Sequence, residues 1–293
     1  MNKQLTIDVL ICSFNKGAVK LDVSVLPPCE GVRYIVSYQY TDDRYLELLP
    51  ESIIKRDDVH LFSYRGQGLS ANRNQAMALA TADLVMFVDD DTRICKGAFD
   101  IIRRTFDDNE SLDIAFFQAS SYTGRLLKHY PTQTCDIIPP HIPYLVSTIE
   151  KVCRRKSVQG QLRYDERFGL GTQFLTCGEE DVWLHDASVA NLQIRYFPTV
   201  IVETNMMLKQ NMLYVDAGVQ RSYGAYLFYI HPHTAFFHCL AFAFNTARKG
   251  MTHFFPMLRH MTEGIRYMRQ SNPFSVRKHY RLSGLFHYCQ ITV

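Results

Sequence analysis

The sequence predicts an α/β protein with a mostly parallel sheet flanked by helices and a C-terminal helical appendage. Over roughly the first 120 residues, strand-like apolar segments alternate with helical patterns, an order that produces a doubly wound parallel sheet with right-handed crossovers. The segment Leu84–Val88 is apolar throughout, as expected for a strand buried on both faces of such a sheet. After Asn205 the strand patterns stop and helical patterns continue to the end.

The composition is that of a folded protein with a sizeable core. The chain has 293 residues, of which 47% are hydrophobic and 21% charged. This length suits one large domain or a domain with an appendage, and we expect an α/β domain over residues 1–205 and a helical region over residues 206–293. The net charge of +3 argues against a general nucleic-acid binder, so we expect no nucleic-acid partner.

In the first half of the chain, apolar runs and turn residues set the expected elements. Strands are expected at Leu5–Ser13, Gly31–Tyr40, Val59–Ser63 and Leu112–Gln118, in addition to Leu84–Val88. Helices are expected from Thr41 to Ile54, from Ser70, as the N-cap residue, to Ala80, and at Ala98–Phe106. Residues 120–145 are rich in Tyr, Pro and His, which suits either a peripheral hairpin or a wall of a binding site.

The second half begins with a glycine-punctuated loop. Between Arg163 and Asp181 three glycines precede three carboxylates, which open a helix expected over Val182–Ala190. Acidic residues in a first helical turn complement the helix dipole, so this pattern alone allows a purely structural role. Two short strands are expected at Gln193–Phe197 and Val200–Glu203, and three helices at Met212–Phe228, Ala235–Arg248 and Phe254–Arg269.

Three carboxylates, Asp89, Asp90 and Asp91, follow the buried strand Leu84–Val88. In open α/β sheets, ligands bind at the carboxyl ends of the strands. Three like charges in a row favour a cation among them, and Mg²⁺ or Mn²⁺ prefers such oxygen ligands. The sequence therefore predicts a divalent metal site, and the alternative is a solvated acidic turn that caps the next helix.

The cysteines and histidines are expected to be structural. None of the eight cysteines forms a Cys-x-x-Cys pair, which favours a reduced, cytoplasmic setting, and Cys12 is expected to act as a small buried hydrophobe. A strand pattern begins close to Met1 without a signal peptide, which agrees with that localisation. His231, His233 and His238 are expected to pack between helices rather than to bind a metal.

Four motifs follow one another along the chain: Val9-Leu10-Ile11-Cys12-Ser13-Phe14-Asn15; Gly68-Leu69-Ser70-Ala71-Asn72-Arg73-Asn74; Phe87-Val88-Asp89-Asp90-Asp91; and Phe168-Gly169-Leu170-Gly171 with Gly178-Glu179-Glu180-Asp181. In their order and spacing they resemble the family-2 glycosyltransferases of the GT-A (Rossmann-like) fold, of the bacterial polysaccharide type. The third motif is similar to the family's Asp-x-Asp strand, and in the second Asn72 stands where the family has alanine. The resemblance covers about residues 5 to 205 and leaves the helical tail unexplained.

The resemblance implies a role for each matching residue. Asp181 would be the general base and Glu180 would position the acceptor, while Asp89 and Asp91 would hold Mn²⁺ or Mg²⁺ on the donor diphosphate. Ser13, Asn15, Gln39, Arg73 and Asp90 would contact the nucleotide sugar. Gln39 stands where the family usually has an acidic residue, and its amide both donates to and accepts from a base edge. For Arg73 the alternative is a surface salt bridge, and for Trp183 core packing competes with sugar stacking.

The implied function is a metal-dependent, inverting transfer of a sugar from a nucleoside diphosphate donor, with UDP as the expected nucleotide. The acceptor would be a hydroxyl of a glycan or of a lipid-linked saccharide. The alternative is a non-catalytic sugar- or lipid-binding scaffold of the same fold. A phosphatase with an Asp-x-Asp strand is disfavoured, because its Thr or Val two positions after the second Asp is replaced here by Arg93.

The tail combines basic and apolar residues. From Arg248 onward there are eight Arg and Lys residues and one acid, Glu263. Aromatic and aliphatic residues lie between these charges, a pattern typical of an amphipathic helix in a membrane interface. This predicts peripheral contact with the inner face of the plasma membrane through the basic C-terminal helices. The alternative is that the apolar side packs on the protein and the basic side is solvated.

Overall fold

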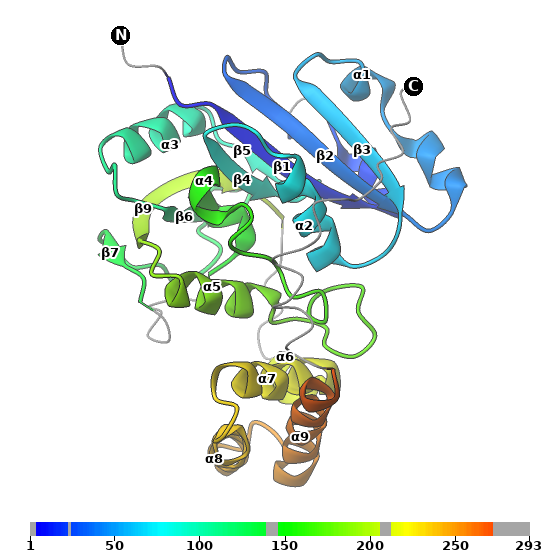
Figure 1. Ribbon diagram of the computed structural model, residues 1–293, viewed down its shortest axis with the longest axis vertical. Helices are drawn as coiled ribbons and strands as arrows, with labels where there is room; N and C mark the ends of the chain where they lie inside the picture. Colours follow the sequence, from blue (N-terminus) through cyan, green and yellow to red (C-terminus); the bar gives the residue numbers. More distant parts are fainter. Residues whose placement is uncertain (1–3, 23–24, 139–145, 206–211, 272–293) are drawn as a thin grey trace. The chain divides into compact units, whose positions relative to one another are not determined.

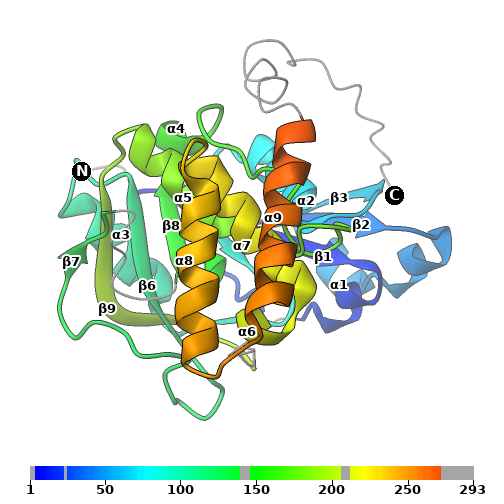
Figure 2. The same cartoon turned by 90° about the horizontal axis from the view of Figure 1, so that it is seen from below.

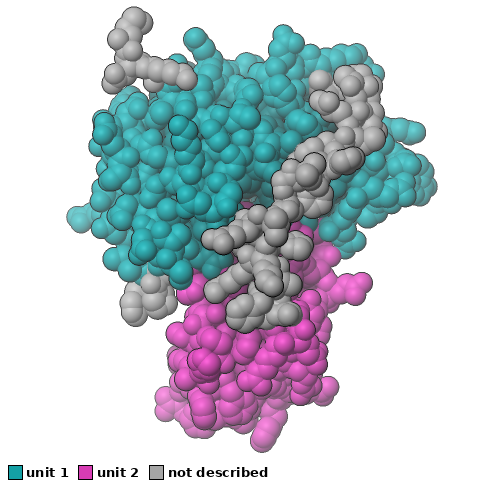
Figure 3. Space-filling model, in the orientation of Figure 1, with its two compact units in different colours: residues 1–67, 71–163, 186–208 teal, residues 68–70, 164–185, 209–293 magenta. Residues whose placement is uncertain are grey.

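The computed structural model describes residues 4–22, 25–138, 146–205 and 212–271, and every structural statement below concerns these residues. The chain forms two compact units (Figure 3). Unit 1 consists of residues 1–67, 71–163 and 186–208, and unit 2 of residues 68–70, 164–185 and 209–293. Unit 2 therefore contains residues 68–70 and 164–185, which precede residue 205, as well as the C-terminal helices. This grouping does not test the functional division predicted at that residue, which stays a prediction.

Unit 1 is built on one curved sheet (Figure 1). Its strands are β1 Ile7–Phe14, β2 Val32–Tyr40, β3 Val59–Arg65, β4 Leu84–Val88, β5 Arg93–Ile94, β6 Ile114–Ser120, β7 Cys135–Asp136, β8 Lys151–Arg154 and β9 Ile194–Glu203. Within the described residues the order is β3-β2-β1-β4-β8-β6-β9-β5, and β7 pairs with β9. The pairs β1–β2, β1–β4, β2–β3 and β6–β9 are parallel. All five residues of β4 are buried, as predicted for a strand covered on both faces.

The α/β class is confirmed, and the sheet is mixed rather than purely parallel. Strand β8 lies between β4 and β6 and is antiparallel to both. It has only four residues, too few to show a period of two, so the sequence did not reveal it. Strand β9 is one strand where two were predicted, and the exposed Pro198 falls where its register with β6 shifts. An irregularity of this kind accommodates a residue that cannot donate to the ladder.

The helices that lie entirely within unit 1 are short. They are α1 Glu51–Ile54, α3 Ala98–Asp107 and α4 Arg155–Val158, together with the 3₁₀ turns η1 Asn15–Lys20, η2 Asp43–Leu48 and η3 Thr148–Glu150. The helix expected up to Ile54 is broken, because Pro50 separates η2 from α1 and proline cannot continue a helix interior. The apolar side of α3, with Phe99, Ile102 and Phe106, shares one core with Ile7 and Val9 of β1.

Helix α2 spans Leu69–Leu79, one residue earlier than predicted. Ser70 therefore lies inside the first turn, and its hydroxyl donates to the carbonyl oxygen of Phe168 at 2.7 Å. The prediction that Ser70 is the N-cap residue is wrong, because the hydroxyl is engaged by a segment distant in sequence.

Unit 2 contains most of the remaining helices: α6 Met212–Val215, α7 Ala217–Ile230, α8 Ala235–Arg248, α9 Phe254–Gln270 and the first part of α5 Glu179–Val189 (Figures 1 and 2). The helix predicted over Met212–Phe228 is divided at Asp216, whose side chain caps α7 by accepting from the backbone N–H of Val219. Helix α8 has the predicted bounds. In the described part of the chain no helix is long and apolar enough to cross a bilayer.

Candidate active site

In unit 1, predicted site residues meet at the carboxyl ends of β1 and β4. The hydroxyl of Ser13, near the end of β1, donates to Asp90 Oδ2 at 2.9 Å. Gly17 lies against the same carboxylate so closely that a Cβ added there would overlap Asp90 Oδ2 and crowd Ser13 Oγ. A side chain at Gly17 would therefore displace Asp90, and the turn after β1 is shaped to let this carboxylate approach the backbone.

Lys20 supplies the cation that the row of carboxylates requires. Its Nζ atom lies 2.9 Å from Asp91 Oδ2 and 3.4 Å from Asp90 Oδ1. The hydrogen bond to Asp91 is the main reason that the pKa of Lys20 is raised. The backbone of the same segment is also held, because the Tyr122 hydroxyl donates to the carbonyl oxygen of Asp91 at 2.5 Å. The sequence analysis did not identify Lys20, which lies 71 residues from Asp91 along the chain.

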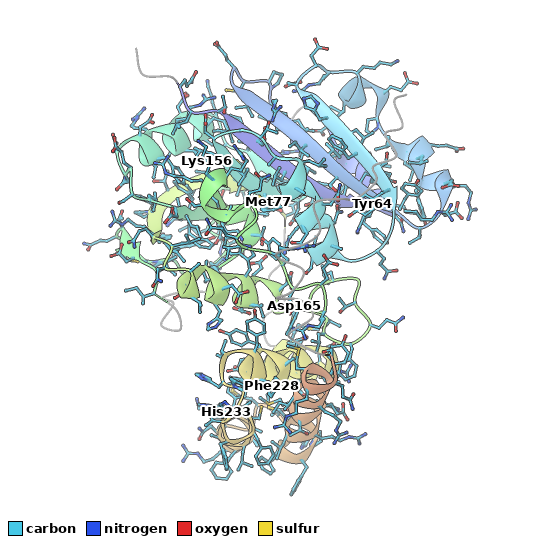
Figure 4. All side chains as sticks on the ribbon, viewed as in Figure 1. Tyr64, Met77, Lys156, Asp165, Phe228 and His233 are labelled. Atoms are coloured by element: carbon cyan, nitrogen blue, oxygen red, sulfur yellow. The ribbon has the colours of Figure 1, made fainter. Side chains whose placement is uncertain are left out.

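A series of hydrogen bonds connects the predicted base contact, Gln39, with Ser13. The side-chain amide of buried Gln39 donates to the hydroxyl of Tyr64 at 2.9 Å, and this hydroxyl lies 3.5 Å from Asn72 Oδ1. Asn72 in turn donates to the carbonyl oxygen of Ser13 at 3.1 Å. Figure 4 labels Tyr64 on β3, where the parallel register sets it directly opposite Gln39 of β2. The contact of Tyr64 with Gln39 follows only from the strand register and could not be predicted from the sequence. Asn72, by contrast, stood out in the sequence as a departure from the family motif.

Asn15 supports the neighbouring backbone. Its φ is 47°, a left-handed conformation that Asn tolerates better than most residues. Its side-chain oxygen accepts from the backbone N–H of Thr41 at 3.0 Å, and its own carbonyl oxygen accepts from the Tyr38 hydroxyl at 2.8 Å. Asn15 thus ties the turn after β1 to the end of β2.

Arg73 lies on α2 and is buried. Its charge acts on the Cys12 thiol, as do the charges of Asp89 and Asp90. Burial raises the pKa of the Cys12 thiol to about 12; the charge of Arg73 opposes this rise, while Asp89 and Asp90 add to it. Arg73 and the two carboxylates therefore act on the same thiol. The alternative of a surface salt bridge does not hold for Arg73, since its side chain is inside the protein.

The residues present suit a divalent ion that shares its ligands with phosphates. Among the described residues no group of three or more His, Cys, Asp and Glu side chains forms a metal cage. The donors that are present are carboxylates, and Mg²⁺ is commonly held by one or two carboxylates together with substrate phosphates and water. Asp89 and Asp91 fit that arrangement, and their role as metal ligands stays a prediction.

In unit 2, Asp181 lies in the first turn of α5, together with Glu179 and Glu180. The predicted start at Val182 is three residues late. Burial raises the pKa of Asp181 to about 7, and the negative charges of Glu180 and Glu179 add to the rise. Its side chain keeps partial solvent access. A carboxylate tuned to neutral pH and still accessible has the properties of a general base.

The glycine-rich loop before α5 packs against that turn. Gly169 has φ +107°, and a Cβ there would press on Ser70 Oγ and on the carboxylate of Glu179. Its N–H donates to the carbonyl oxygen of Leu175, and Leu170 accepts from the N–H of Leu69. The motifs predicted separately as a helix start and an acceptor loop are therefore one structure within unit 2.

Trp183 is part of the core of unit 2. It is 2% exposed, and its ring stacks on Tyr164 at a centroid distance of 5.9 Å. Core packing, rather than sugar stacking, is thus the role that this geometry supports.

The sequence and the fold were compared with known proteins. The model of the glycosyl transferase family 2 matches residues 25–170. The solved structure of S. aureus TarS 1–349 superposes with a TM-score of 0.55 at 14% identity, covering 92% of each chain. The same fragment in complex with UDP-GlcNAc gives a TM-score of 0.52 at 16% identity, covering 76% of this chain and 67% of that one. No curated protein sequence matches the chain.

A longer TarS structure gives a TM-score of 0.51 at 16% identity, with 76% of this chain covered, and the chain spans 40% of its length. At such identities these structures establish the fold, which is the GT-A fold of nucleotide-sugar enzymes. With the family match, the chain belongs to the family-2 glycosyltransferases, and it is an enzyme of that class.

Proposed function

We propose that the chain transfers a sugar from a UDP-sugar to a hydroxyl of a glycan or lipid-linked acceptor, with inversion at the anomeric carbon. The observation that carries this proposal is Asp181, whose pKa of about 7 suits a general base at neutral pH. UDP is proposed because the TarS fragment is solved with UDP-GlcNAc and because Gln39 offers an amide to a base edge.

On the donor side, the residues of unit 1 bind and orient. Gln39 would meet the base, and its contact with Tyr64 fixes the orientation of its amide. Ser13 orients the carboxylate of Asp90, which would accept from ribose or sugar hydroxyls. Asp89 and Asp91 would hold Mn²⁺ or Mg²⁺, which when bound supplies charge neutralisation to the departing diphosphate. The buried Arg73 would add positive charge near these carboxylates.

On the acceptor side, Asp181 would take the proton from the attacking hydroxyl. The new bond joins that oxygen to the anomeric carbon as the bond to the diphosphate oxygen breaks, and the nucleoside diphosphate leaves with the electron pair. One in-line displacement inverts the anomeric configuration. Glu180, in the same helical turn, would hold the acceptor while its charge helps to keep the pKa of Asp181 high.

Thermal stabilisation by a panel of nucleotide sugars with Mn²⁺ tests the donor, because a ligand that binds only the native state raises the melting temperature. We expect stabilisation by UDP-sugars in the wild type and its loss in Asp91→Asn. The control is Asp108→Asn, an exposed acid after α3, which should behave like the wild type. Stabilisation of Asp91→Asn equal to that of the wild type would remove Asp91 from the donor site.

A further inference from the structure

Helix α8 exposes large apolar side chains. Phe237 is 67% exposed, Phe244 59% and Phe236 46%, and Phe255 in the first turn of α9 is 79% exposed. We call these four residues, together with Leu240, the aromatic face. Monomeric proteins seldom leave contiguous apolar surface of this kind without a partner.

Small residues occupy the fully buried positions of α8. Ala235, Cys239 and Ala243 recur every four residues and are 0–2% exposed, in one core with Met257 and Met261 of α9. The large residues Phe236, Phe237, Leu240 and Phe244 lie on the side that internal packing does not use, whereas Phe242 packs against this core and against Tyr223 of α7. This is the reverse of the usual amphipathic helix, whose bulky residues face the core.

The exposed rings are connected from one helix to the next. Phe236 and Phe237 have centroids 5.9 Å apart. Phe244 lies 6.5 Å from Phe254, and Phe254 lies 5.1 Å from Phe255. The aromatic face thus continues from α8 onto the start of α9, two helices that lie side by side in Figure 2.

The stretch of sequence that carries the aromatic face contains no acidic residue. The sequence has no Asp or Glu from Ala217 to Thr262. Arg248 and Lys249 are exposed where α8 ends, and His231, His233 and His238 are exposed around its start, where Figure 4 labels His233. His231 at the end of α7 and His238 of α8 stack with ring centroids 4.6 Å apart, so the predicted packing between helices is confirmed for these two, and Arg248 and Lys249 give the rim the positive charge that suits an anionic partner.

The basic C-terminal helices were predicted to contact a membrane. The apolar side of α9 is not available for this contact, because it packs inside the protein. Met257, Ile265 and Met268 of that helix are buried. The tail residues Phe274, Arg277, Lys278, Arg281, Leu285 and Phe286 lie outside the described residues. Among the described helices, α8 carries the largest group of exposed apolar side chains, whereas α5 and α6 expose the single residues Val189 and Val215.

We propose that the aromatic face of α8 inserts into the interfacial region of an anionic lipid bilayer, with Arg248 and Lys249 against the headgroup phosphates. Interfacial helices combine Phe and Leu on one side with Lys and Arg at the polar boundary, and each basic residue near an anionic leaflet strengthens binding. A second copy of the chain fits less well, because the two basic rims would repel each other. This inference rests on the proposed function and makes it more specific, because a bilayer bound by α8 would present a lipid-linked acceptor to the enzyme.

Co-sedimentation of the full chain with phosphatidylcholine vesicles, with and without phosphatidylglycerol, tests this surface. We expect binding that increases with phosphatidylglycerol and falls with salt. The double variant Phe237→Ser with Phe244→Ser should lower the partition coefficient by about tenfold or more, since burial of one such ring is worth more than a factor of ten. Arg248→Glu with Lys249→Glu should remove the preference for anionic vesicles.

The control is Val189→Ser, which replaces a 64% exposed apolar residue of unit 1 and should bind vesicles like the wild type. The proposal is overturned if the wild-type chain does not bind anionic vesicles at low salt. It is also overturned if sedimentation velocity shows a dimer that the Phe variants convert to a monomer while their vesicle binding stays unchanged. Stabilisation by UDP is measured on each variant. Its absence in the wild type would contradict the proposed function, whereas vesicle binding reports only on α8.

Discussion

Lys20 and Asp91 form an ion pair at the carboxyl ends of β1 and β4, with Nζ 2.9 Å from Oδ2, and the same ammonium reaches Asp90 at 3.4 Å. A lysine in this place neutralises carboxylates that are also the proposed metal ligands. It would therefore compete with a divalent ion bound there for the same oxygen atoms.

Replacement of Lys20 by Met should tighten the binding of Mn²⁺ in the absence of nucleotide. Both partners in the pair with Asp91 are partly exposed, so the gain is that of an exposed ion pair, roughly a twofold to fivefold fall in the dissociation constant. Electron paramagnetic resonance of free Mn²⁺ measures it. Lys16→Met changes an exposed lysine in the same turn and serves as the control. Weaker Mn²⁺ binding in Lys20→Met would show that the two cations do not compete.

The rate of transfer should rise with pH through the pKa of Asp181, about 7, because only the carboxylate accepts the proton. Asp181→Asn should lose about 10²-fold or more in turnover while it retains donor binding. Glu180→Gln should move the rising limb of the profile to lower pH, since the charge of Glu180 raises the pKa of Asp181. A profile of Glu180→Gln that does not shift would argue against Asp181 as the titrating group.

The same pKa determines how Asp181 affects stability. Its folded-state pKa is raised, so between pH ~4 and ~7 the native state holds a proton that the unfolded state has lost, and the free energy of unfolding falls as pH rises through this window. Asp181→Asn removes the effect. Its melting temperature should therefore exceed that of the wild type by more at pH 8 than at pH 5. A difference independent of pH would show that ionisation of Asp181 is not costly in the fold.

Gln39→Leu should weaken UDP binding by roughly threefold to tenfold, the scale of one lost hydrogen bond, and should reduce the preference for UDP over GDP. Isothermal titration with both nucleotides measures the two effects. Tyr64→Phe keeps the amide of Gln39 and removes the hydroxyl that contacts it, so it should weaken UDP binding less than Gln39→Leu. Equal UDP and GDP affinities in the wild type would contradict base recognition by Gln39.

Helices α7 and α9 touch through their backbones at two glycines. A Cβ at Gly264 would overlap the carbonyl oxygen of Arg221, and one at Gly224 would overlap that of Met261. Gly264→Ala should therefore separate the helices and lower the free energy of unfolding by about 1–3 kcal/mol or more. Thermal denaturation measures this, with Thr262→Ala, whose hydroxyl donates to the carbonyl oxygen of Arg259 within α9, as the control. A melting temperature of Gly264→Ala equal to that of the wild type would show that the helices can shift without cost.

The features that the sequence by itself determined are local in origin. The buried strand Leu84–Val88 follows from its unbroken apolar run, and α8 and α9 follow from the helical patterns of their own segments, since a helix or strand of this kind is specified by neighbouring residues. The acids that open α5 were also visible, because their position in a first turn depends only on the adjoining loop.

Tertiary structure decided which of these residues meet. Lys20 reaches Asp90 and Asp91 because β1 and β4 pair in parallel, and Gln39 meets Tyr64 because the register of β2 with β3 sets them opposite each other. Periodicity likewise predicted α8 but not which side would be buried. The small side chains Ala235, Cys239 and Ala243 face the core, while Phe236, Phe237 and Phe244 face outward, because the available space is set by α9 rather than by the residues of α8.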